Sequence, residues 1–83
     1  MNAITAVSRA PFALPADPLE RYSALKLMAG SYITLTSGDF TVSGVLTTVI
    51  APAAGADHPA PVVVIDTGWE RIAGPVLGGD CLT

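Results

Sequence analysis

The chain has 83 residues, which is enough for one domain with a single small core. Hydrophobic residues make up 51% of the sequence and charged residues only 13%, so we expect apolar surface that favours contact with protein, unless a coding bias has simply placed alanine at surface positions. The net charge is −3 and the four cations are scattered, which argues against binding to a nucleic-acid backbone.

The rest of the composition predicts a cytoplasmic protein with no cofactor and no membrane contact. No segment is apolar over the length of a membrane span, and the first residues lack the basic and hydrophobic regions of a secretion signal. Cys81 is the single cysteine, so it cannot form an internal disulfide, and we expect an exposed free thiol. His58 stands apart from any second ligand or nucleophile, which predicts neither a metal site nor a catalytic triad.

Residues 1–15 combine small apolar residues with two prolines and show no periodic pattern, which predicts an extended or disordered arm. The arm is either a frayed terminus or a segment that docks on a neighbouring subunit through its larger apolar side chains, Ile4, Val7, Phe12 and Leu14. We expect residues 16–77 to form a helix-capped small β-barrel and residues 78–83 to form a tail.

A helix is predicted from residue 18 to about residue 29. Asp17 is a suitable N-cap, Pro18 takes the first helical position, and Gly30 is a typical helix stop. Apolar residues cover a broad face of this helix, so we expect it to cover one open end of the sheet.

Residues 32–50 predict the central β-hairpin. Apolar and β-branched residues alternate with polar ones on both sides of a turn at residues 37–39, which is the pattern of two half-buried strands. Gly38 can supply a positive φ in the turn, and Gly44 in mid-strand indicates a bulge or sharp bend. The candidate contact residues on this hairpin are Tyr32, Ile33, Leu35 and Phe40, with packing inside the domain as the alternative for the two aromatic side chains.

After a Pro/Ala-rich loop at residues 51–61, we expect a central strand at residues 62–65, another at residues 69–72 and a short pairing at residues 76–77. Trp69 is expected to close the core or, as the alternative, to anchor an interface. These elements predict a mainly β fold: a small SH3-like barrel or a rolled antiparallel sheet of four to five strands with one N-terminal helix.

Residues 25–46, LKLMAGSYITLTSGDFTVSGVL, resemble the opening of a Sm/Lsm-type small barrel. The matching positions are Gly30, Ile33, Leu35, Gly38, Asp39, Val42, Gly44 and Leu46. The resemblance implies the fold of such barrels and their assembly through exposed strand edges. It does not extend to RNA binding, because residues 47–50 replace the RNA-binding loop and residues 71–74 lack the family's second signature.

Residues 63–68, VVIDTG, resemble the Asp-Thr-Gly triplet of aspartic proteases, whose dimeric form takes one Asp from each subunit. The resemblance makes Asp66 a candidate catalytic residue, in which two carboxylates share a proton and activate water. Two features argue against a protease. Trp69 follows the triplet where a small residue is usual, and few residues remain to form the hairpin flap of such enzymes. The alternative is a strand that ends in a turn, where Asp66 accepts backbone N–H bonds.

We therefore expect a non-enzymatic protein-interaction or assembly module that associates with itself or with a host or assembly protein. Its expected contact residues are Tyr32, Ile33, Leu35, Phe40 and Trp69. The alanine-rich, lysine-poor composition resembles that of high-GC bacteria and their phages, which suggests a phage-encoded structural or host-directed protein. The alternatives are an Lsm-like nucleic-acid-binding protein and a dimeric aspartic protease that uses Asp66.

Overall fold

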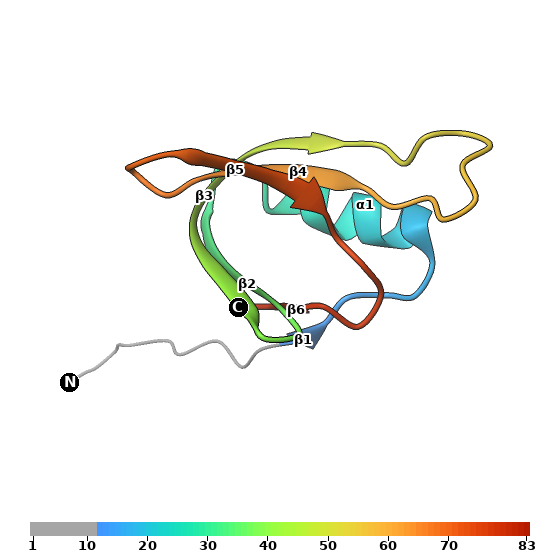
Figure 1. The fold of residues 1–83 in the computed structure, drawn as a ribbon, viewed down its shortest axis with the longest axis horizontal. Helices are drawn as coiled ribbons and strands as arrows, with labels where there is room; N and C mark the ends of the chain where they lie inside the picture. Colours follow the sequence, from blue (N-terminus) through green and yellow to red (C-terminus); the bar gives the residue numbers. More distant parts are fainter. Residues whose placement is uncertain (1–11) are drawn as a thin grey trace.

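The computed structural model describes residues 12–83, which form one antiparallel sheet and one helix. The sheet has six strands in the order β1-β6-β2-β3-β4-β5, with β1 and β5 at its edges (Figure 1). The elements in chain order are β1 (Phe12–Ala13), α1 (Pro18–Leu27), β2 (Tyr32–Ser37), β3 (Phe40–Ile50), β4 (Val62–Asp66), β5 (Arg71–Pro75) and β6 (Cys81–Leu82). The sheet is rolled and not closed into a barrel, so the predicted mainly β class and the rolled-sheet form are confirmed.

The helix begins where the sequence predicts and ends slightly earlier. The Asp17 side chain caps it by accepting a hydrogen bond from the backbone N–H of Glu20 at 3.0 Å, and Pro18 takes the first position. α1 ends at Leu27, and Gly30 then takes a φ of +89°, a conformation that favours glycine. α1 packs against β3 and lies away from the turn that joins β2 to β3 (Figure 1).

β2 and β3 form the predicted hairpin and pair along the whole of β2. Gly38 has a φ of +58° in the turn, as the sequence predicts. The bulge lies between Leu46 and Thr48 rather than at Gly44. Gly44 instead permits β3 to approach β4 closely, because a Cβ atom at this position would overlap the backbone carbonyl of Asp66.

The roll gives the sheet a concave face, which holds the core, and a convex face. The bulge in β3 exchanges the faces of the residues that follow it, so that Val49 packs against the core and Ile50 is half exposed. The core combines side chains from the helix, the strands and both ends of the described chain: Leu14, Leu25, Ile33, Leu35, Leu46, Val63, Ile65, Val76 and Leu82.

The sheet includes residues from both segments that the sequence predicts to lie outside the domain. β1 and β6 pair with each other, and β6 also pairs with β2. Residues 78–83 are therefore not a free tail, because a turn at Gly79, with a φ of +87°, returns the chain to the sheet. β5 begins at Arg71 rather than at Trp69. Residues 1–11, the rest of the predicted arm, lie outside the described residues.

Arg21 holds both ends of the described chain against α1. Its side chain is only 4% exposed, and its guanidinium donates hydrogen bonds to the backbone carbonyls of Val76 at 2.9 Å, Pro15 at 3.0 Å and Ala16 at 2.6 Å. The sequence pattern presents Arg21 as one of four scattered cations. Its position one helical turn before the buried Leu25 nevertheless places it on the inner face of the helix.

Candidate protein-interaction site

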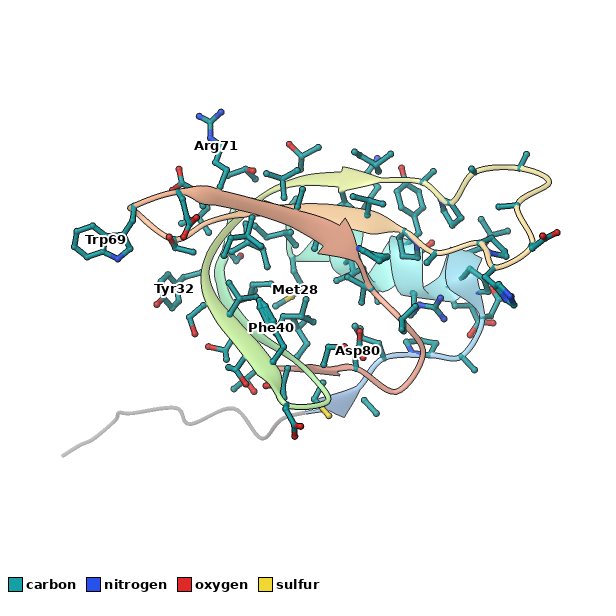
Figure 2. The ribbon with its side chains drawn as sticks, viewed as in Figure 1. Met28, Tyr32, Phe40, Trp69, Arg71 and Asp80 are labelled. Carbon is teal, nitrogen blue, oxygen red and sulfur yellow. The ribbon has the colours of Figure 1, made fainter. Side chains whose placement is uncertain are left out.

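An exposed aromatic surface lies on the convex face of the sheet, beside the turn that joins β4 to β5. The strand register places Tyr32 opposite Val45, Val45 opposite Asp66, and Asp66 opposite Arg71, so these residues form one row across four strands. Trp69 lies in the adjoining turn and is 94% exposed, and Tyr32 is 69% exposed. Figure 2 shows both side chains projecting at the same end of the molecule. We call Tyr32, Val45, Trp69 and Arg71 the aromatic surface.

Hydrogen bonds inside the β4–β5 turn fix the position of Trp69. The backbone N–H of Gly68 donates to the Asp66 carboxylate at 2.9 Å, and the N–H of Trp69 donates to the Thr67 hydroxyl at 3.3 Å. The N–H of Thr67 donates to the carbonyl of Glu70 at 3.0 Å, and Gly68 supplies a φ of +96°. Such bonds from Asp and Thr side chains are typical of tight turns. The Asp-Thr-Gly triplet is thus the frame of a turn that presents an indole ring to solvent.

A groove of about 300 Å³ opens on the concave face between the β2–β3 hairpin and β5. We call it the β2–β5 groove. Its lining comes from β2, β3, β4 and β5 and is apolar apart from Ser37. Phe40 lines the groove while remaining 49% exposed, and Figure 2 shows it pointing into the space enclosed by the rolled sheet. Since β5 is an edge strand of the described sheet, one wall of the groove has free backbone groups.

The structure separates the five predicted contact residues into two groups. Ile33 and Leu35 are 1% and 7% exposed, so Ile33 belongs to the core and Leu35 reaches a partner only through the groove that it lines. Tyr32, Phe40 and Trp69 are exposed. The expectation that Trp69 closes the core is wrong, because the turn carries it beyond the end of the strands. The packing alternative for Tyr32 and Phe40 also disagrees with their exposure, and all three remain candidates for contact.

The sequence pattern does not reveal Arg71 as a member of the row that contains Tyr32. The alternation of β3 places Val45 on the outward face, and the short turn of the β2–β3 hairpin pairs Val45 with Tyr32. The place of Arg71 depends on the register between β3 and β4, which are separated by the long Pro/Ala-rich loop, and no local signal in that loop fixes the register.

The other candidate residues of the sequence stand alone. His58 is exposed in the loop between β3 and β4, and Cys81 is a partly buried free thiol in β6. Within residues 12–83, no group of three His, Cys, Asp or Glu side chains could hold a metal ion. No helix in this part of the chain is long and apolar enough to span a membrane.

Comparison of the chain with protein families, with curated proteins and with solved structures finds no match. The resemblance to Sm/Lsm-type barrels therefore stays a prediction. The fold and the site define a small β-rich protein that exposes an aromatic surface on one face of its sheet and an apolar groove on the other.

Proposed function

We propose that the chain is a non-enzymatic protein-interaction and assembly module that associates with itself through the aromatic surface. The exposure of Trp69 carries this proposal, since a large aromatic side chain held in water at the tip of a hydrogen-bonded turn gains its main stabilisation from a partner. Trp, Tyr and Arg are also the residue types that dominate binding energy at protein interfaces. Trp69, Tyr32 and Arg71 supply one of each at the same end of the sheet.

Charge and symmetry support a contact between copies of the chain. Asp66 and Arg71 lie side by side in the row across the sheet, and they carry opposite charges. A two-fold axis that passes between these two residues would bring each of them near its opposite in the other copy. The strands beside the row expose hydroxyls, with Thr34 and Ser43 hydrogen-bonded to each other at 2.8 Å, which suits the polar rim of an interface.

Measurement of mass by light scattering during size-exclusion chromatography tests the proposal. We expect a discrete oligomer that dissociates when Trp69→Ser or Tyr32→Ser is introduced, because truncation of an interface anchor costs about 2–4 kcal/mol, or roughly 30- to 1,000-fold in affinity. Leu27→Ser is the matched control, since Leu27 is 86% exposed on α1. A wild-type chain that stays monomeric at every concentration, or a Trp69→Ser variant with the wild-type mass, contradicts the proposal.

The two alternative functions have separate tests. An Lsm-like protein would bind a labelled oligouridine with steep salt dependence, and the absence of binding at low salt excludes it. An aspartic protease would lose all activity with Asp66→Asn, a change that the turn tolerates because Asn also accepts backbone N–H bonds. The bond from the N–H of Gly68 to the Asp66 carboxylate fits the alternative in which residues 66–68 form a turn. A phage-encoded origin rests on composition alone and stays a prediction.

A further inference from the structure

The β2–β5 groove is an apolar site that the aromatic surface does not account for. A Cβ atom added to Gly74 would meet no other atom within 4 Å, so the groove is open beside β5. Phe40 is half exposed while it lines the same groove. An open apolar groove of this kind is suited to a bound segment. The free edge of β5 favours an extended segment, because such a segment can pair with the strand.

Residues 1–11, MNAITAVSRAP, have the chemistry that this groove requires. Small or aliphatic side chains predominate among them, with Ile4 and Val7 as the branched ones, and the segment contains no acidic residue. Arg9 is its one charged side chain, so residues 12–83 hold the other three of the four cations and all seven acids, a net charge of −4. Asp39 lies in the turn next to Phe40. The segment and the rest of the chain are therefore complementary in both hydrophobicity and charge.

The backbone direction of β1, followed back from Phe12, leads towards the aromatic surface. β1 and β2 both pair antiparallel with β6, so they run in the same direction, and Phe12 and Leu35 both lie opposite Leu82. A chain that precedes Phe12 and continues this direction leads towards the Tyr32 end of β2. On β2 the lining of the groove comes from Leu35 and from Ser37, at the other end of the strand. Tyr32 belongs to the aromatic surface, so the direction of β1 leads towards a second copy bound there.

We propose that residues 1–11 of one copy occupy the β2–β5 groove of a second copy, as an extended segment beside β5. Eleven extended residues span up to about 36 Å, which is enough to cross a contact at the aromatic surface. In a two-fold dimer each copy gives one segment and receives one, so the exchange is closed. This inference rests on the proposed self-association and specifies its second contact.

Paired variants of the full-length chain test the proposal from both sides. Ile4→Ser with Val7→Ser removes the branched aliphatic side chains of the segment, and Asn2→Ser with Thr5→Ser changes two polar positions without a change of charge as a control. Gly74→Leu fills the groove, and Ala29→Leu adds similar apolar bulk at an exposed position after α1 that does not line the groove. We expect the dissociation constant of the dimer to rise at least about tenfold with each test variant and to stay unchanged with each control. Circular dichroism checks that every variant is folded.

A cross-link identifies the occupant directly. In a Cys81→Ser background, Val7→Cys in one sample and Gly74→Cys in another are mixed and oxidised, and we expect a disulfide between the two copies because Gly74 faces the open groove. If the segment and groove variants keep the wild-type dimer while Trp69→Ser dissociates it, the inference is overturned and the proposed function stands. A monomeric wild-type chain overturns both. A disulfide that forms within one chain of the double-cysteine variant assigns the groove to the chain's own segment and overturns the role of the second copy.

Discussion

Replacement of Arg21 by methionine tests whether a buried guanidinium holds the two ends of the described chain in place. The side chain of Arg21 is 4% exposed, and its three hydrogen bonds join the neighbouring carbonyls of Pro15 and Ala16 to the distant carbonyl of Val76. Methionine has a similar length and is apolar, so the change removes the donors and keeps much of the packing.

Two opposing effects determine how much the free energy of unfolding falls in Arg21→Met. A hydrogen bond from a charged donor contributes about 1.5–3 kcal/mol, and three carbonyls lose such a donor together. Removal of a buried charge recovers part of its desolvation cost, which is on the order of several kcal/mol. Because the carbonyls stay partly buried, we expect the first effect to exceed the second and the free energy of unfolding to fall by about 2–4 kcal/mol. A domain of this length has a total of roughly 4–12 kcal/mol, so the loss is a large fraction of its stability.

Urea denaturation followed by circular dichroism measures the loss, and Lys26→Met, at an exposed position of α1, is the matched control. We expect Arg21→Lys to fall between the wild type and Arg21→Met, since an ammonium lacks the planar fork that reaches several carbonyls. Native-state hydrogen exchange should lose protection first at the amides of Leu14 and Val76, which bond to Asp80 and Pro61. An Arg21→Met variant as stable as the wild type would refute the proposed role of Arg21.

Three further changes test other parts of the fold. Gly44→Ala should lower the free energy of unfolding by about 1–3 kcal/mol, because the added Cβ would overlap the carbonyl of Asp66. Gly74→Ala should leave the free energy of unfolding unchanged or raise it slightly, because its Cβ meets no atom within 4 Å. Equal effects of the two changes in urea denaturation would contradict this account of Gly44. At a concentration where the wild-type chain is monomeric, Trp69→Ser should change the free energy of unfolding by less than about 0.5 kcal/mol, and a loss of several kcal/mol would return Trp69 to the core. Asp80→Ala should lower the free energy of unfolding by about 1–3 kcal/mol, because the carboxylate accepts a hydrogen bond from the N–H of Leu77 at 2.8 Å. Asp80→Asn should recover part of this loss. Equal melting temperatures for the wild type and both variants would show that the bond is dispensable.

Local patterns predict the helix and the central hairpin of this fold. The Asp17 cap, Pro18 at the helix start and Gly38 in the turn each act within a few residues of their own position, so the sequence carries the whole signal. The bulge after Leu46 and the strand at Cys81–Leu82 depend on pairing between distant segments. No short window of sequence contains both partners of such a pair, and these elements are accordingly the ones that the sequence misplaces.

The candidate site follows the same division. The hairpin alternation identifies Tyr32 as outward-facing, and the Asp-Thr-Gly turn is a correct alternative for residues 66–68. The exposure of Trp69 is not predictable from its type, because tryptophan is usually largely buried. It follows from three hydrogen bonds that close the turn before β5 begins at Arg71. The burial of Arg21 is predictable from helical spacing, provided that a charged residue is allowed on the inner face.

Because the sheet is open, the two proposed contacts also bear on how far the chain can assemble. A closed barrel has no free edge, whereas this sheet has two, and an exposed edge strand invites continuous pairing between molecules. Here β1 has only two residues, and β5 ends at Pro75, which has no N–H to donate to a neighbouring strand. These edges can therefore pair with a short segment more readily than with a long strand of another sheet. A segment that fills the groove beside β5 would occupy the longer of the two edges, and the assembly would stop at a closed oligomer instead of growing into a fibre.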